Sequence, residues 1–243
     1  MKQITLILFL AIVAYGCSED YDGDHDSQNN ELNLKDFFCD INSLEEPIVM
    51  VYTVDSVGHL SQNYYQYSRI SEDRIEVIIY NSGFEPQATI IDEFNENGVE
   101  LISNTPFIEN DSNSRTSKIL KGQVFSFIPG EVTGDLETQI NGIDNGIEWS
   151  TIDKVSWGII DTVFKEFNNN KTKTLITKGI VNREILFDGQ PYRENLPNTN
   201  WYSEGIGLTR LEYESPFGTV SETYVKTITI EEFNELKKGA NKS

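Results

Sequence analysis

The sequence has few of the residues from which metal sites and nucleophilic centres are built. Its 243 residues include two cysteines, Cys17 and Cys39, and two histidines, His25 and His59. A zinc site needs clustered cysteine and histidine ligands, and a nucleophilic triad needs a base that is most often histidine. Neither histidine has such partners nearby in the chain, and no Gly-x-Ser-x-Gly elbow, phosphate-binding loop or complete dinucleotide fingerprint occurs. We therefore expect no catalytic nucleophile, no metal site and no cofactor.

Basic residues are scarce as well. The chain carries 19 Lys and Arg against 39 Asp and Glu, which gives a formal net charge of −20. A surface of this sign repels nucleic acid and anionic lipid headgroups. We expect no nucleic-acid partner, and a charge of this size otherwise indicates solubility more than function.

Long apolar runs are missing except near the start, where Ile4 to Val13 is almost continuously apolar. This run is too short to span a bilayer, which needs roughly 20 residues. It follows the charged Lys2 and precedes small residues, which is the pattern of a cleaved signal peptide. The sequence therefore predicts export, with residues 1–16 removed as the signal peptide.

The four residues Ala14-Tyr15-Gly16-Cys17 resemble the bacterial lipobox, with small residues at the third and first positions before the cysteine. The resemblance implies cleavage after Gly16 and attachment of diacylglycerol to Cys17, usually with a third acyl chain such as palmitate. Two or three acyl chains hold a protein stably on a membrane, whereas one gives only marginal binding. We expect Cys17 to be the lipid attachment site. The alternative is ordinary secretion, with the cysteine a coincidence.

An acidic segment follows the cysteine, since residues 18–31 contain six Asp and Glu and no Lys or Arg. So few apolar side chains cannot stabilise a packed structure, and we expect residues 17–31 to be a lipidated, solvated tether. Its start, Ser18-Glu19-Asp20, resembles the surface-export signal of Bacteroidota lipoproteins. This resemblance implies anchoring in the outer membrane with display at the cell surface. A lipoprotein that faces the periplasm is the alternative.

Residues 32–238 are expected to form a single β-rich domain. Most apolar runs are short, rich in β-branched and aromatic residues, and separated by turn residues, which is the pattern of strands. Asn97-Gly98 is a strong hairpin signal. We predict a mainly β fold of about ten to twelve antiparallel strands in a curved sheet, either a half-barrel or a barrel, with a β-sandwich as the alternative. Strands are expected at 48–54, 60–70, 74–80, 88–94, 99–103, 119–128, 155–167, 172–181, 184–187, 201–213 and 219–230.

One or two short helices are expected beside the sheet. Residues 31–41 place four apolar side chains on one helical face. Thr229 and Glu232 have the spacing of a capping box that opens a last helix over residues 231–238. Residues 239–243 are expected to be a frayed tail.

The ten residues from Trp201 to Arg210, Trp-Tyr-Ser-Glu-Gly-Ile-Gly-Leu-Thr-Arg, resemble a C-terminal hairpin common in secreted Bacteroidota β proteins. Gly205 and Gly207 permit a bulge or a tight bend between paired strands. The resemblance implies a sheet like the half-barrels of periplasmic lipoprotein carriers, which cradle acyl chains. It transfers no functional residue, because the motif is structural.

Two short motifs, Asp-Ser-Val at 55–57 and Asp-Thr-Val at 161–163, resemble the acceptor of Bacteroidota O-glycosylation. The first lies in a predicted turn, where a glycan is tolerated, and the second lies within a predicted strand. Ser56 and Thr162 are therefore candidate O-glycosylation sites.

Paired carboxylates are the one catalytic device that the composition supplies, because glycosidases use two Asp or Glu about 5–10 Å apart. With 39 acidic residues, such pairs are expected by chance. Glu148 and Asp153, beside Trp149 and Trp157, form the best candidate pair.

Three hypotheses of function follow. The first is a non-catalytic envelope lipoprotein whose curved sheet binds a hydrophobic ligand or a glycan. The second is a surface structural or protein-interaction lipoprotein without a ligand pocket, and the third is a glycosidase-like enzyme. A large apolar pocket would favour an acyl chain, an exposed row of Trp or Tyr would favour a glycan, and a filled barrel would favour the second hypothesis.

Overall fold

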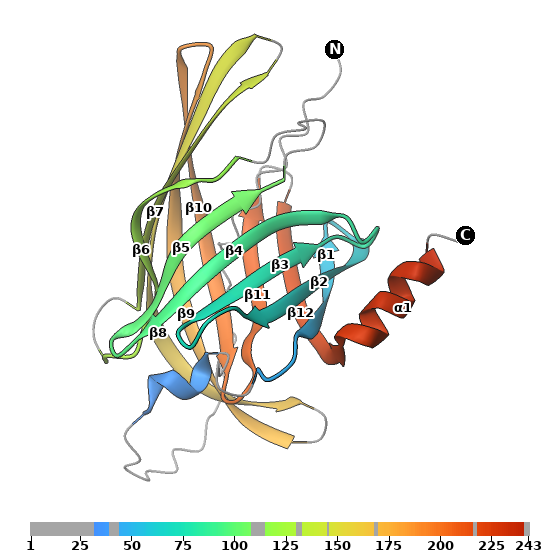
Figure 1. Cartoon of the computed structure of the whole chain (residues 1–243). Helices are drawn as coiled ribbons and strands as arrows, with labels where there is room; N and C mark the ends of the chain where they lie inside the picture. The colour runs from blue at the N-terminus through green and yellow to red at the C-terminus, as the bar shows by residue number, and fades with distance from the viewer. Residues whose placement is uncertain are drawn as a thin grey trace.

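The computed structural model describes residues 32–38, 44–107, 115–129, 133–144, 146–167, 170–215 and 218–240. Twelve antiparallel strands form one closed barrel, in which each strand pairs with its neighbours in the chain (Figure 1). The first and last strands complete the circle through nine paired residues. The prediction of a mainly β barrel is confirmed, and this closure excludes the half-barrel and the sandwich. The strands are β1 (Ile48–Ser56), β2 (His59–Arg69), β3 (Arg74–Tyr80), β4 (Pro86–Asn95), β5 (Gly98–Pro106), β6 (Lys118–Ser126), β7 (Gly134–Asp144), β8 (Ile147–Phe167), β9 (Asn170–Phe187), β10 (Gln190–Ser203), β11 (Gly207–Ser215) and β12 (Gly218–Thr229).

Each strand alternates between a face that points into the barrel and a face that points outward. This is clearest in β8, where every second residue from 149 to 157 is buried and the residues between are half-buried or exposed. Alternation with a period of two is what a closed sheet requires, because successive side chains leave opposite faces. The buried residues of this row are Trp149, Thr151, Asp153, Val155 and Trp157.

Two stretches that the sequence pattern left unassigned are strands. Residues 134–154, in β7 and the start of β8, contain few consecutive apolar residues and owe their structure to pairing with each other. β10 contains Pro191 and Pro197, which cannot donate to a neighbouring strand. They are tolerated because β10 pairs with β9 along its whole length but with β11 only from Asn198 onward.

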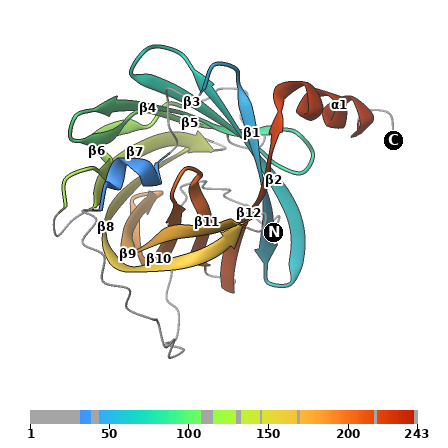
Figure 2. The same ribbon diagram turned by 90° about the horizontal axis from the view of Figure 1, so that it is seen from below.

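A short 3-10 helix, η1 (Leu34–Phe37), lies across the end of the barrel at the bottom of Figure 1, which we call the lower end (Figure 2). It occupies one turn of the range 31–41 in which a helix was predicted. Its two apolar side chains enter the barrel and join a buried cluster with residues of the wall. The buried residues of this cluster are Leu34, Phe37, Val99, Phe125, Leu175 and Tyr202.

One α-helix, α1 (Ile230–Ala240), lies outside the barrel beside β1 and β12 (Figure 1). The predicted capping box is present: the Thr229 N–H donates to the Glu232 carboxylate at 2.9 Å, and the Glu232 N–H donates to the Thr229 hydroxyl at 3.2 Å. Phe233 is buried against β1 and β2 residues on the outer face of the barrel. The helix ends two residues beyond the predicted end. Within the described residues, no helix is both long and apolar enough to cross a membrane.

The hairpin between β10 and β11 contains a β-bulge, as the two glycines of its turn led us to expect. The register shifts between Trp201 and Tyr202, and the turn holds Gly205 at φ +73° and Gly207 at φ +95°. The shift directs Tyr202 into the buried cluster at the lower end, while the Arg210 guanidinium lies 5.1 Å from the centre of the Trp201 ring. The motif therefore shapes the lower end of the barrel.

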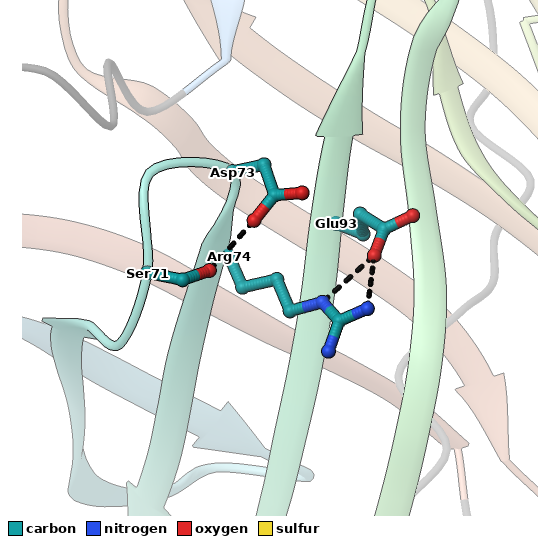
Figure 3. A network of polar contacts seen from close by, with 4 residues as sticks. All are labelled: Ser71, Asp73, Arg74 and Glu93. Carbon is teal, nitrogen blue, oxygen red and sulfur yellow. Dashed lines mark hydrogen bonds and ion pairs between the residues drawn. The ribbon is translucent and has the colours of Figure 1, made fainter.

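An exposed polar network orders the turn between β2 and β3 (Figure 3). The Ser71 hydroxyl donates to the Asp73 carboxylate at 2.6 Å, and the Arg74 Nε donates to the Glu93 carboxylate at 2.7 Å. The Ser71 hydrogen bond lowers the pKa of Asp73. Water screens charges this exposed, so the network fixes a surface turn and contributes little to stability.

Candidate functional site

Polar side chains line the interior of the barrel toward the end opposite η1, which we call the upper end. These residues lie on the inward face because each stands two positions from a buried core residue of its own strand, and residues two apart share a face. Strand pairing places them side by side around much of the wall. We call this set the polar band; it comprises Asn63 and Tyr65 of β2, Glu222 of β12, Tyr213 of β11, Arg183 of β9, Asp153 of β8 and Thr138 of β7.

Glu222 is the buried acid at one side of the polar band. The Tyr65 hydroxyl donates to one carboxylate oxygen at 2.8 Å, and the Asn63 amide donates to the other at 3.3 Å. Burial raises the pKa of Glu222, and these two hydrogen bonds offset part of that effect. Burial and the neighbouring Glu222 also raise the pKa of Tyr65 well above its ordinary value. The two side chains therefore form a buried donor–acceptor pair that favours the neutral tyrosine.

Asp153 and Arg183 form an ion pair at the other side of the band. The Arg183 Nε and Nη2 donate to the two carboxylate oxygens at 2.7 and 3.1 Å, and the side chains are 12% and 2% exposed for Arg183 and Asp153. Tyr213 lies between the two charged groups of the band. Burial and Glu222 raise the pKa of Tyr213 to about 12, while Arg183 acts in the opposite direction. The charges at both sides of the polar band therefore act on the same tyrosine.

Asp92 is a second buried acid, on β4. Its Oδ1 has no hydrogen-bond partner in the protein, and burial raises its pKa to about 7. Burial is the main cause that raises the pKa of Tyr202 on β10, and the negative charge of Asp92 raises that pKa further. Because β4 and β10 are not neighbours in the barrel, these two side chains act on each other across the lumen.

The Asp92→Asn variant is expected to lose a pH dependence of stability. The unfolded Asp92 carboxyl titrates near 3.8, whereas the folded one titrates near 7. Between these two values the unfolded chain releases a proton that the barrel retains, so the free energy of unfolding falls as pH rises, by up to about 4 kcal/mol in total. Urea unfolding of both proteins across this range measures the difference. If the free energy of unfolding changes with pH in the same way for the variant and the unchanged protein, Asp92 is not buried without a partner.

Other buried polar atoms of the described residues also lack a protein partner. Most belong to inward-facing side chains of the barrel. Buried polar groups in folded proteins pair with protein, water or ligand, so this lumen suits polar contents better than an acyl chain. The residues concerned are Asp92, Asn104, Thr151, Trp157, Thr177 and Asn198.

A cavity of about 720 Å³ opens beside the polar band, at the upper ends of β7, β8 and β9. Arg115 spans its wall: Nη1 and Nη2 donate to the carbonyls of Asn141 and Ile143 at 3.2 and 3.4 Å. The guanidinium carbon lies 5.6 Å from the centre of the Trp149 ring. The cavity is lined by Arg115, Asn141, Gly142, Ile143, Glu148, Trp149, Ser150, Leu186 and Gly189.

Glycine makes room for each inward tryptophan of β8. Gly142 pairs with Trp149 and Gly134 pairs with Trp157 across the β7–β8 ladder. A Cβ at Gly142 or Gly134 would lie 2.3 or 2.2 Å from the facing indole ring. The two tryptophans are therefore core residues that pack flat on the wall, as tryptophan in strands commonly does.

The prediction that Glu148 and Asp153 form a catalytic carboxylate pair is wrong. The two residues are five apart on one strand and so lie on opposite faces of it. Glu148 is exposed at the cavity, whereas Asp153 is buried and paired with Arg183. Among the described residues, no group of three or more His, Cys, Asp and Glu gathers closely enough to hold a metal ion.

Of the three predicted modification sites, the structure describes Ser56 and Thr162. Cys17 lies outside the described residues, as do His25 and Cys39. Ser56 is the last residue of β1 and is half-buried, whereas Thr162 is exposed within β8. The strand position that suggested a shielded Thr162 therefore leaves it more accessible than Ser56.

Sequence reasoning did not find Glu222, Arg183, Asp92 or Arg115. A signal exists for the first, since Glu222 takes an inward position between Val220 and Tyr224 in a strand with period-two alternation. A charged residue in an apolar row of this kind indicates a buried polar group. Arg115 carries no comparable signal, because it lies outside the strands and its hydrogen-bond partners named here are backbone carbonyls of β7.

Comparison with known proteins finds related folds among solved structures. No family model matches the chain, and no curated protein matches it. A crystal structure of a "putative lipoprotein" from Parabacteroides distasonis has a TM-score of 0.52 and 13% identity, covering 79% of this chain and 98% of that one. The hypothetical lipoprotein YmcC from Escherichia coli has a TM-score of 0.36 and 9% identity, covering 76% and 86%. At these identities the first likeness shows the fold alone, and the second carries no argument.

Proposed function

We propose that the chain is a lipid-anchored envelope lipoprotein whose barrel is non-catalytic and binds a polar, saccharide-type ligand at its upper end. The anchor is inferred from the signal peptide and from the lipobox-like residues before Cys17. The Ser18-Glu19-Asp20 start of the tether favours the outer face of the outer membrane over a periplasmic orientation. In this proposal residues 17–31 are the tether and residues 32–238 are the functional domain.

The observation that carries the ligand proposal is the cavity at the upper end. Its lining offers the donors and acceptors that bind sugar hydroxyls: the Arg115 guanidinium, the Asn141 amide, the Glu148 carboxylate and the Ser150 hydroxyl. Trp149 adds an aromatic edge beside them. Pockets of several hundred Å³ with a few convergent polar groups are the usual form of a small-molecule site.

An acyl ligand has less support than a saccharide. The lower lumen is filled by the rings of the cluster around η1, and the polar band lies above it. An acyl chain in the lumen would also face buried polar atoms that it could not satisfy, such as those of Thr151, Thr177 and Asn198. The filled lower lumen also keeps one other function open, a surface interaction protein without a small ligand.

A glycan array probed with the mature chain, carrying Cys17→Ser to remove the lipid, tests the ligand proposal. We expect binding to a restricted set of saccharides and a loss of roughly tenfold or more in affinity for Glu148→Ala, since one charge-assisted hydrogen bond contributes about 1.5–3 kcal/mol. Glu100→Ala is the control, because Glu100 is also an exposed strand glutamate but lies on β5, away from the cavity. No saccharide binding would favour the interaction protein, whereas equal binding by both variants would mean that a saccharide binds away from this cavity.

O-glycosylation stays a prediction at Ser56 and Thr162. The exposure of the side chain favours Thr162, whereas the turn beside Ser56 favours the first motif. Mass spectrometry of the protein from its native host distinguishes the two.

A further inference from the structure

The hairpin of β8 and β9 extends beyond the barrel at the lower end (Figure 1). β8 pairs with β7 only as far as Trp157, and β9 pairs with β10 only from Thr174 onward. β8 beyond Trp157 therefore pairs only with β9, and its last four residues, 164–167, pair with the first four of β9, 170–173, in a two-stranded end about 13 Å long at the rise of a β-strand. We call residues 158–167 and 170–173 the lower hairpin.

One face of the lower hairpin combines an exposed aromatic ring with two lysines. Cross-strand partners share a face, and the partners here are Phe164 with Lys173 and Glu166 with Lys171. Phe164 is 60% exposed, and the Lys171 ammonium lies 4.8 Å from the centre of its ring. Ile160 is also 55% exposed, but it is the unpaired residue of the bulge and is not assigned to this face. An exposed aromatic ring beside two lysines is the combination used by elements that lie in a membrane interface.

The charge of this region is opposite to that of the whole chain. The lower hairpin contains Lys165, Lys171 and Lys173 against Asp161 and Glu166, a local balance of +1 in a chain of −20. The overall charge repels anionic lipid headgroups, but the Debye length at physiological salt is only about 8 Å. A local cluster of lysines can therefore bind an anionic surface that the rest of the protein avoids.

The other face of the lower hairpin is fixed to the barrel. The Phe167 ring lies 6.2 Å from the Tyr224 ring of β12, and the Thr174 and Ser203 hydroxyls are hydrogen-bonded at 2.8 Å. These contacts hold the hairpin in one orientation, so its apolar and basic face is presented as a preformed surface.

The described chain begins at the same end of the barrel. Leu32 and Leu34 pack in the cluster that also contains Ile159 and Leu175, at the base of the lower hairpin. Cys17 precedes Leu32 by 15 residues. A tether of that length reaches at most about 50 Å, which is enough to bring the lower hairpin to the membrane that holds the lipid.

We propose that the lower hairpin docks on the surface of the anchoring membrane. Phe164 enters the boundary between headgroups and acyl chains, and Lys171 and Lys173 bind headgroup phosphates, as in interfacial amphipathic elements. The proposal rests on the lipid anchor of the proposed function. Its consequence is a fixed orientation, in which the cavity at the opposite end of the barrel faces away from the membrane.

Depth-dependent fluorescence quenching tests the docking. The lipidated mature chain is reconstituted in vesicles of phosphatidylethanolamine and phosphatidylglycerol that contain a lipid brominated on its acyl chain. Phe164→Trp is compared with Leu60→Trp, since Leu60 is 72% exposed at the upper end of β2, and the signal of the native tryptophans is subtracted. We expect quenching at position 164 to exceed that at position 60 by about threefold or more. Adding Lys171→Glu and Lys173→Glu to Phe164→Trp should reduce it.

Three results would overturn the proposal in distinguishable ways. Equal quenching at positions 164 and 60, in protein that floats with the vesicles, removes the docking and leaves the anchor intact. A mature chain that floats no better than Cys17→Ala removes the anchor and the docking together. A glycan found on Thr162 in the native protein also removes the docking, because a sugar on this face would hold the hairpin away from the lipid.

Discussion

Replacement of Arg183 by methionine is expected to lower the free energy of unfolding by about 3–5 kcal/mol, because it leaves the Asp153 carboxylate buried without a counter-charge. Asp153 is 2% exposed and receives both of its close ion-pair hydrogen bonds from Arg183. Guanidinium unfolding followed by tryptophan fluorescence and circular dichroism measures the change.

Two further variants separate the ion pair from general damage to the barrel. Arg193→Met removes a similar bond to Glu184, but that pair is exposed and should contribute no more than about 1 kcal/mol. The double variant Asp153→Leu with Arg183→Met removes both buried charges and should recover most of the stability, because apolar pairs of similar size often replace buried ion pairs without loss. A loss below about 1 kcal/mol for Arg183→Met alone would mean that water reaches Asp153.

The buried ion pair also bears on function, because it divides the lumen. Below it lie apolar rings, and above it lies the cavity with Arg115 and Trp149. The pair joins β8 to β9, the strands that carry Trp149 and Leu186 of the cavity lining, although neither charged residue lines the cavity itself. Holding these two strands together reduces the entropy that the site must lose on binding a ligand.

The strands that could be predicted are those whose own side chains alternate. Ile48 to Val54 and Arg74 to Tyr80 were assigned from apolar runs, and both are strands. Closure of the sheet could not be predicted, since β1 and β12 are joined by residues about 180 positions apart, such as Ile48 and Thr229. Local sequence patterns carry no information on such pairing, because the backbone N–H and C=O groups of a strand can bond to any antiparallel neighbour of suitable register.

Bulges explain why the site residues were harder to predict than the strands. One extra residue, such as Ile160 in β8, moves every later side chain to the opposite face. Thr162 therefore shares a face with the buried Leu175, and so does Phe164, which is exposed because β8 has passed the end of its pairing with β7. The pattern of polar and apolar residues alone does not locate such a shift, so the lower hairpin could not be recognised as a surface from the sequence.

Replacement of Phe37 by alanine is expected to destabilise the whole barrel by about 3–5 kcal/mol, although Phe37 lies in one turn of helix before the first strand. Its side chain is almost fully buried in the lower lumen, where it packs in one cluster with Phe125, Leu175 and Tyr202. Removal of the ring leaves a cavity that these residues cannot fill, since each is fixed by its own strand. Urea unfolding of the mature chain measures the loss.

Lys35→Ala is the matched control, because Lys35 is in the same helix and its side chain is exposed. It should change stability by less than about 0.5 kcal/mol. If Phe37→Ala has an equally small effect, the barrel is stable without η1 and the folded domain begins at β1. A large and cooperative loss would mean that η1 folds with the barrel. The tether would then end at Leu32, directly beside the lower hairpin, which is the geometry that membrane docking requires.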